Sequence, residues 1–428
     1  MRVVNLLTAP WIPTPDGPVT LTDVWAEGAA TGRLTSGRPL ADAALLRLLC
    51  VMHARAHGEP QQYLQQHEAG LQLYDLTRPF MQVPAAWTDT LPETPIHALT
   101  LCHATGRDAT LLGGTLDASP RAVSAADAVL DLLTYHAFAP SRGVTRFHYS
   151  KDTPLARVLT FHAHGATLQD TLALNAPPVA PTPPTWERAP DWQAWRQADP
   201  IPLDATTVHA WPWRSATLVP DSTTQVRAVK LASGPVPTAA PEQPSPDAHA
   251  LQSTVPEADH VRLGRAYEQR RNPPSREGRR ALVDALRQTL LRDPLAPLGF
   301  RHALTQGAQR VSVTGLSTRP GQPVILGVIQ AELPWPTIAP GDAAALLTVV
   351  QEQADALERV LYVRAKTEGR TRQDVQAAPD LRVYWENVWP YLSGALVGAV
   401  LEEVLAEVAQ SCAASALKGA SSSLLRFS

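Results

Sequence analysis

Proline places the strongest limit on the fold of this chain, because many of its 40 prolines are gathered into clusters. Residues 176–190 hold six prolines and residues 234–246 hold five. Each proline fixes its own φ and disfavours the α region for the residue before it. Both stretches are therefore expected to be extended or irregular, and the regular elements must lie between and around them.

Beyond Pro340 the apolar residues recur at spacings of three and four, which is typical of amphipathic helices packed as an antiparallel bundle. One such series is Leu346, Val350, Ala354, Leu357 and Leu361; the other is Val397, Val400, Leu401, Val404, Leu405 and Val408. The change of pattern predicts a domain boundary near residues 335–340. We expect an N-terminal mixed domain over residues 1–336 and a C-terminal helical bundle over residues 340–428.

The N-terminal part mixes both kinds of element, so the predicted fold class is α+β. Helices are expected at 39–53, at 125–138 after Ser124 as N-cap, and at 279–292. Strands are expected within 3–12, at the start of 157–174, and at 206–220, 225–231, 310–313 and 323–330. A turn over residues 317–322 separates the last two.

The composition predicts a protein of the cytoplasm. A hydrophobic fraction of 44% can supply buried cores, and 428 residues suggest two or three domains. The three cysteines are widely spaced and odd in number, so neither a disulfide framework nor a zinc knuckle is expected. The first residues do not resemble a signal peptide, and no apolar run is long enough for a membrane span.

Arginine is concentrated in residues 261–301, where ten arginines stand against four acids for a net charge of +6, although the whole chain has a net charge of −3. Such a patch can neutralise phosphates without reading bases. The candidates for phosphate contact are Arg276, Arg279, Arg280 and Arg287. A solvated helix face whose charge is balanced by acids elsewhere is the alternative interpretation.

Common catalytic motifs are missing from the sequence. There is no GxxxxGK[ST], no GxSxG and no HExxH, and no pair of acids stands out as a general acid and base. His162 and His164 would face the same side of a strand and could bind a metal, but no third ligand is evident. A binding or scaffold role, with no cofactor and no metal, is therefore favoured over catalysis, although triads assembled in space remain possible.

Several segments resemble, in order along the chain, the CasA family of large subunits of type I-E CRISPR surveillance complexes. Each motif is weak alone, and the shared order carries the resemblance. The segments are 5–13 (NLLTAPWIP), 43–49 (AALLRLL), 78–82 (RPFMQ), 109–112, 133–140 (LTYHAFAP), 206–220, 226–234 and 313–317. Trp11 and Phe80 within them are interpreted as core residues.

The resemblance implies a function that is not enzymatic. Members of this family read the PAM beside the target in double-stranded DNA, help to open the duplex, stabilise the R-loop and dock a helicase-nuclease. The implied partners are the backbone, handle-binding and small subunits of the crRNA-guided complex, the crRNA 5′ handle, the DNA and the helicase-nuclease, with no membrane. In such complexes the guide reads sequence, and the protein reads only a short duplex mark.

The family's PAM-reading elements fall on identifiable positions of this chain. Its glutamine wedge corresponds to the 317–322 turn, where Gln322 is the best candidate; an ordinary polar residue at a hairpin tip is the alternative. Gly321 and Arg319 belong to the same turn. The glycine loop corresponds to residues 141–146 and keeps one glycine, so the candidates there are Ser141, Arg142, Gly143 and Arg146. Lys230 is the candidate for the lysine finger, and a structural or solvated lysine is the alternative.

Two further departures from the family are visible. The loop beside the crRNA handle is represented by Thr110, Leu111 and Leu112, and relatives often carry an aromatic residue where Leu112 stands. The fourth helix of the bundle is expected to be short or missing, because a run rich in alanine and serine follows the third apolar helix. A structural end-cap that no longer reads the PAM, and a metal-dependent hydrolase built on His162 and His164, are the alternative functions.

Overall fold

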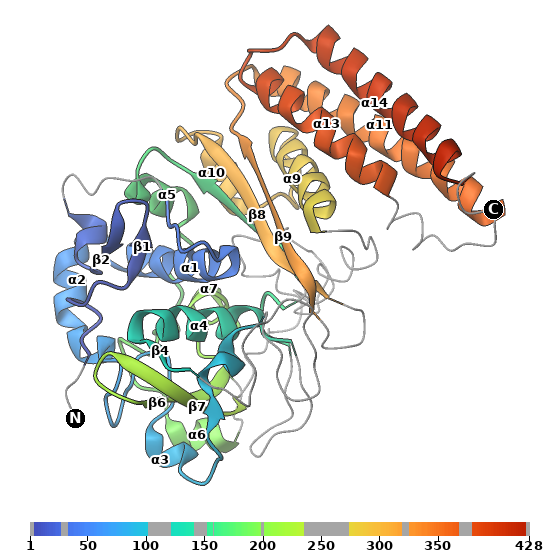
Figure 1. The fold of residues 1–428 in the computed structure, drawn as a ribbon. Coiled ribbons are helices and arrows are strands. Elements are labelled where there is room, and N and C mark those ends of the chain that lie inside the picture. Colours follow the sequence, from blue (N-terminus) through green and yellow to red (C-terminus); the bar gives the residue numbers. More distant parts are fainter. Residues whose placement is uncertain are drawn as a thin grey trace.

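The computed structural model of the chain describes residues 4–26, 33–101, 121–140, 152–156, 158–197, 201–234, 274–318, 325–367 and 379–424. Helices and antiparallel sheets occur together in it, so the predicted α+β class is confirmed. Figure 1 shows the helices of the C-terminal part standing to one side of the mixed N-terminal part.

The elements before residue 234 surround two long helices, α1 (Pro39–Arg55) and α4 (Ala125–Phe138), which pack against each other. The remaining helices there are α2 (Pro60–Gln66), α3 (Ala85–Thr88), α5 (Leu168–Asn175), α6 (Trp192–Gln197) and α7 (Ala205–His209). The predicted N-cap of α4 is confirmed, because the Ser124 hydroxyl accepts a hydrogen bond from the backbone N–H of Asp127 at 3.0 Å.

One sheet is built around β7 (Gln225–Ser233), which pairs in antiparallel fashion with three strands. Its partners are β6 (Arg214–Pro220), β3 (Thr94–Pro95) and β4 (Val123–Ser124). A separate small hairpin joins β1 (Ile12–Thr14) to β2 (Gly17–Val19).

The other large sheet has the order β5-β8-β9 and is antiparallel throughout. It contains β5 (Thr160–His164) and the long hairpin of β8 (Arg310–Thr318) and β9 (Ile325–Pro334), whose register ends at the pair Thr318 and Ile325. The hairpin predicted from the sequence is confirmed. β8 runs on from the predicted end at residue 313 to Thr318 and so includes the first two residues of the predicted turn, and β9 runs on from the predicted end at residue 330 to Pro334.

Each face of this sheet packs against a buried core cluster, although Gln330 of β9 is exposed. On one face Val311, Val313 and Ile329 pack into a core cluster with α9 (Pro274–Leu290) and α10 (Leu298–Ala303). On the opposite face Leu316 and Val328 pack into the cluster that contains α1 and α4. The sheet therefore forms the middle layer of the molecule, between α1 and α9 (Figure 1).

In the described part of the chain beyond Pro340, three long helices pack together: α11 (Pro340–Thr367), α13 (Pro379–Leu396) and α14 (Glu402–Leu424). The cluster on the α9 face of the sheet continues into these helices, so one core spans both sides of residues 336–340. The division into domains at that point remains a prediction.

Three predicted elements differ from those observed. The strand expected within residues 3–12 is mostly a turn: Asn5 forms an isolated bridge to Gln72, residues 6–8 turn, and β1 begins only at Ile12.

The helix expected from Val397 begins at Glu402, because Gly398 takes a φ of 72° and ends α13 in the left-handed conformation. The strand expected from residue 206 begins at Arg214. Asp204 and Thr207 form a capping box that starts the short helix α7 instead.

No helix among the described residues is both long and apolar enough to cross a membrane.

We expect Leu316→Ala to destabilise the protein by about 2–4 kcal/mol, because Leu316 is 5% exposed and a buried leucine leaves a cavity when it is truncated. Ser317→Ala, one residue along β8, is the control and should stay within about 0.5 kcal/mol. Urea unfolding followed by tryptophan fluorescence measures both. A loss below about 1 kcal/mol for Leu316→Ala would contradict the packing of this face.

Candidate nucleic-acid interface

The candidate PAM-reading residues flank the described ends of the β8–β9 hairpin and of α4. Arg319, Gly321 and Gln322 lie between the paired residues Thr318 and Ile325, outside the described residues. Leu316 and Ile325 pack against the α1–α4 core, so the end of the hairpin is supported on that core. The structure thus fixes where this turn leaves the fold.

Ser141, Arg142, Gly143 and Arg146 also lie outside the described residues, but the segments on both sides of them are held together. The Thr153 hydroxyl donates to the carbonyl oxygens of Ala137 at 2.8 Å and Ala139 at 3.1 Å. The backbone N–H of Thr153 donates to the Ala139 carbonyl as well, at 3.2 Å.

A buried arginine supports the same carbonyl. Arg214, 4% exposed at the start of β6, donates from Nη2 to the Ala139 oxygen at 3.2 Å. Its backbone N–H donates to Nδ1 of His136, whose Nε2 lies 2.9 Å from the Met81 carbonyl oxygen. His136 must therefore be neutral with its proton on Nε2, and burial lowers its pKa to about 3.

Residues 79–82 of the RPFMQ motif are buried and adjoin this network, whereas Arg78 is half-buried. Met81 has a φ of 54°, which turns its carbonyl toward His136. Gln82 donates to the Leu73 carbonyl at 2.7 Å and accepts from the Leu218 N–H at 2.7 Å. Phe80 is 1% exposed and packs edge-on against Trp11, so the interpretation of both as core residues is confirmed.

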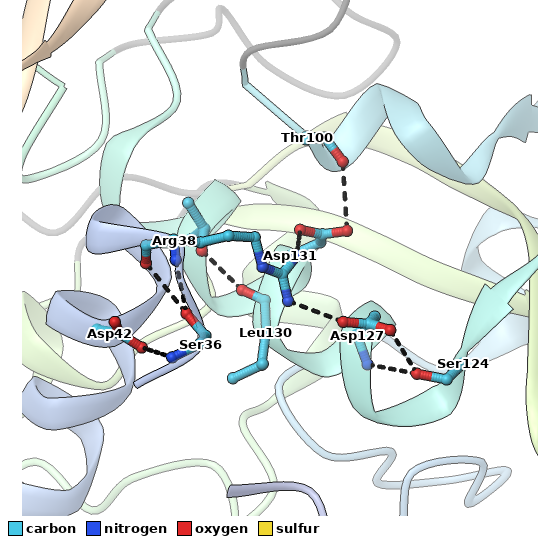
Figure 2. Close-up of polar contacts among 9 residues, drawn as sticks. Ser36, Arg38, Asp42, Thr100, Ser124, Asp127, Leu130 and Asp131 are labelled. Carbon is cyan, nitrogen blue, oxygen red and sulfur yellow. Dashed lines mark hydrogen bonds and ion pairs between the residues drawn. The ribbon is translucent and has the colours of Figure 1, made fainter. Parts of the chain in front are cut away.

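The other end of α4 carries a second network, which Figure 2 shows. Arg38, at the N-cap of α1, pairs through Nη1 with Asp131 at 2.6 Å and through Nη2 with Asp127 at 3.0 Å. Asp131 also accepts from the Thr100 hydroxyl at 3.2 Å. Burial raises the pKa of Asp131 to about 6, against the opposing effect of Arg38.

This second network includes a residue that comes shortly before the candidate handle loop in the sequence. Thr110, Leu111 and Leu112 lie outside the described residues, but Thr100 precedes that stretch and β4 follows it. Asp131 lies 93 positions from Arg38 and 31 positions from Thr100 in the sequence. No local pattern in the sequence could therefore have revealed these two contacts.

The arginines proposed for phosphate contact lie on α9, and those with described side chains contact their own chain. The Arg280 guanidinium lies 2.7 Å from Asp355 and 2.5 Å from Glu358 of α11. That of Arg279 lies over the Trp389 ring of α13, 5.6 Å from its centroid, and Arg287 lies 3.4 Å from Asp284. For Arg276 the structure describes the helix backbone only.

Lys230 lies on β7 opposite Thr217 and is half-buried. It therefore belongs to the sheet built around β7, whereas the β8–β9 hairpin belongs to the other large sheet. The structure does not bring the described candidates Lys230, Arg279, Arg280 and Arg287 into one site. What it brings together are the ends of α4 and of the hairpin, and sequence reasoning missed the buried Arg214, His136 and Asp131 that support them.

His162 and His164 share one face of β5 and line a cavity of about 100 Å³ with Ser312, Thr314 and Glu332. His164 Nε2 lies 2.7 Å from the Ser312 hydroxyl, and burial lowers the pKa of His164 to about 4. Among the described residues, no group of three or more His, Cys, Asp or Glu side chains could hold a metal. The described surroundings of the pair thus add no third ligand.

Comparison with known families and structures gives consistent results. The profile of the CRISPR-associated protein Cse1 family matches residues 5–376. The CRISPR-associated protein CasA/Cse1 of Thermus thermophilus is 30% identical over 254 residues, which cover 50% of this chain and 49% of the relative. The matched region thus spans about half the length of that relative.

The fold is shared with solved structures of low sequence identity. The structure of Thermus thermophilus CasA (Cse1) has a TM-score of 0.71 at 20% identity and covers 98% of this chain and 94% of the other. A chain of a CRISPR RNA-guided surveillance complex has a TM-score of 0.67 at 18% identity, with coverage of 96% and 94%.

We expect Asp131→Asn to change how the stability depends on pH. The folded-state pKa of about 6 lies above the ordinary 3.8, so the folded protein binds more protons between these values. Asp131 therefore makes stability fall by up to about 3 kcal/mol as pH rises from 4 to 6. Its replacement should remove this contribution.

Chemical unfolding at pH 4, 5, 6 and 7 measures the effect as the difference between variant and parent chains. His136 and His164 act in the opposite direction, because their pKa values are lowered and stability from them rises with pH. Both histidines are present in every chain, so the difference isolates the carboxyl group. Parallel pH profiles for Asp131→Asn and the parent would contradict the assignment.

Arg280→Ala should destabilise the protein by about 2 kcal/mol, because it leaves Glu358, 8% exposed, without the arginine that pairs with it. Arg287→Ala removes an arginine from the same helix and should cost less than about 0.5 kcal/mol. Thermal unfolding compares the two. Equal losses would show that the α9–α11 ion pairs do not stabilise the fold.

Proposed function

Because the chain belongs to the Cse1 family of CRISPR-associated proteins, we propose that it is the large subunit of a CRISPR RNA-guided surveillance complex. The ordered sequence motifs had indicated this family, and that identification is confirmed. The likeness to a chain of such a complex supports the assignment to an assembly.

Within that complex we propose that the protein reads the PAM in double-stranded DNA. The turn holding Arg319, Gly321 and Gln322 would enter the minor groove, with Gln322 as the wedge. Minor-groove readout is degenerate and tolerates several PAM sequences. The cost of unstacking at the wedge is offset when guide and target begin to pair.

The observation that supports this proposal best is that the three candidate segments follow residues of the same buried core. Leu101 before the handle loop, Phe138 before residues 141–146, and Leu316 before the hairpin turn all belong to one buried cluster. Segments that leave one rigid core can hold DNA and the crRNA handle in a fixed relation.

A supported hairpin turn suits a wedge, because a residue that separates bases must resist being pushed back. Nine register pairs join β8 to β9 up to Thr318 and Ile325, and each face of the sheet packs against a buried core. Ser141, Arg142, Gly143 and Arg146 would contact the same duplex from the end of α4, and Lys230 would assist from β7.

The remaining roles follow from the family. Thr110, Leu111 and Leu112 would meet the crRNA 5′ handle. Phosphate contact by the arginines of residues 261–301 is proposed from their local net charge of +6 and not from the family, and Arg279 and Arg280 are engaged within the chain. The partners would be the backbone, handle-binding and small subunits, the target DNA and a helicase-nuclease, in the cytoplasm. The protein would hold and open DNA without catalysing a reaction itself. An end-cap that does not read the PAM is the alternative.

The decisive test is target binding by the reconstituted complex, with and without this chain, against a library of randomised flanking bases. We expect a PAM-dependent gain in affinity that Gln322→Ala reduces at least tenfold. Gln330→Ala is the matched control, because Gln330 is exposed on β9 of the same hairpin, and it should change affinity less than twofold.

The other outcomes are equally informative. A gain in affinity that is independent of the flanking bases would support the end-cap or a DNA clamp, and would direct attention to the arginines of 261–301. No gain at all would contradict a role for this chain in target binding.

A further inference from the structure

The face of the β5-β8-β9 sheet that is turned toward α1 changes character along its strands. Near the end of the hairpin it is apolar, and Leu316 and Val328 pack there into the cluster of α1 and α4. Because alternate residues share a face, the register carries this face on to a run of polar side chains on all three strands. They are Thr160, His162, His164, Arg310, Ser312, Thr314, Gln330 and Glu332.

The polar part of this face lines the cavity of about 100 Å³ already described for the two histidines. One row across the sheet joins His162 to Ser312 and Ser312 to Glu332. The facing wall is mostly apolar and comes from α1, α5 and the residues just before α1: Leu34, Pro39, Ala43, Leu46 and Leu168. Protein interiors are close-packed, so a row of polar side chains beside open space is not explained by core packing.

The cavity is reached from solvent on the side of its charged residues. The side chains of Arg33 and Glu332 are 47% and 36% exposed, whereas His162 is 2% and Leu46 5% exposed. Arg33 Nη1 lies 3.3 Å from one carboxylate oxygen of Glu332, and Arg310 Nη1 lies 3.3 Å from the other. Both contacts are longer than a strong charge-assisted hydrogen bond, so the carboxylate and the guanidinium retain capacity for a ligand.

The charges around the cavity balance. Arg33 lines it together with Asp42 and Glu332, and Arg310 pairs with Glu332 from beside it. Burial, with the two arginines nearby, lowers the pKa of His164 to about 4, so its ring is neutral at pH 7. A phosphate would meet two acids here and a cation two arginines. The lining therefore favours a neutral ligand that both donates and accepts hydrogen bonds.

A single pyrimidine base matches this space. The cavity has room for about seven to ten water molecules, which suits one ring with its substituents better than the two fused rings of a purine. Bases stack on histidine rings and on guanidinium planes, and His162, His164 and Arg33 supply both. A glutamate accepts a hydrogen bond from the amino group of cytosine. Uracil and thymine have an oxygen in that place, which a carboxylate repels.

We propose that the cavity between α1 and the polar end of the β5-β8-β9 sheet binds one cytosine base, whose amino group donates to Glu332 and whose carbonyl accepts from Arg33. The base comes either from a free nucleoside or nucleotide or from an unpaired position of a strand. The strand source alone rests on the proposed function, because a complex that opens a duplex exposes such bases. The site itself can be tested on the full chain without the complex.

The first measurement is a titration of the full chain with cytidine and with uridine, followed by saturation-transfer NMR. We expect saturable cytidine binding with a Kd of about 1 mM or tighter, in the range open to a ligand of this size. Uridine should bind at least tenfold more weakly. No saturable binding, or equal binding of the two nucleosides, would overturn the proposal and leave the polar face as a structural network.

Glu332→Gln tests the contact that selects cytosine. An amide donates as well as accepts, so cytidine should bind at least tenfold more weakly and its advantage over uridine should disappear. The variant should melt as the parent does, because exposed ion pairs contribute little to stability. Glu403→Gln, on the exposed surface of α14, is the matched control and should change neither affinity. A cytidine preference that survives Glu332→Gln would contradict the assignment.

Ala43→Leu tests the place of binding by another route, because it fills the cavity and alters no polar group. It should weaken cytidine at least tenfold, and unchanged binding would place the nucleoside elsewhere and overturn the proposal. Thermal unfolding shows whether this variant is folded, and Glu332→Gln decides the question if it is not.

Short oligonucleotides separate the two sources of the base. A thymidine pentanucleotide with one central cytidine that binds at least tenfold more tightly than free cytidine, and more tightly than the all-thymidine strand, supports a base within a strand. Equal affinity of the strand and the nucleoside supports a free ligand. Either result depends on the full chain alone, so failure of the flanking-base test for PAM reading would leave it unchanged.

Discussion

The rest of the structure depends on a three-stranded sheet that packs against a buried core on each face. Apolar residues of β8 and β9 alternate between the α1–α4 core on one side and the α9 and bundle core on the other. Because each face packs against a core, the hairpin is held in place from both sides. The segment that carries Gln322 therefore leaves β8 from a fixed position, as the proposed reading of a DNA groove would require.

Buried polar groups complete this support where apolar packing ends. Arg214, His136 and Asp131 are each satisfied by partners far away in sequence, and each lies next to the start or end of a candidate binding segment. Removing one partner would leave a desolvated polar group, so these networks impose one arrangement on the segments that leave α4. In the proposed function, they hold the handle loop and the loop at residues 141–146 in relation to the hairpin.

The arginines of α9 illustrate how one sequence feature allows two interpretations. A net charge of +6 over residues 261–301 is compatible with a phosphate-binding surface, but Arg279 and Arg280 contact Trp389, Asp355 and Glu358. Their acidic and aromatic partners come from α11 and α13, more than 70 residues away. Charge along a sequence therefore reveals a surplus of cations and not which of them remain available to DNA.

The sequence by itself determined the α+β class, the positions of α1, α4, β7 and the β8–β9 hairpin, and the family, because periodicity, Ser124 as a cap and the order of short motifs are local properties. It predicted α7 wrongly, since the capping box of Asp204 overrode a strand-like pattern. Only the tertiary structure decided that one core runs across residues 336–340, that Asp131 meets Arg38 and Thr100, and that His162, Ser312 and Glu332 line one cavity against α1. These contacts join residues distant along the chain, and their energies arise from burial and pairing that no local pattern records.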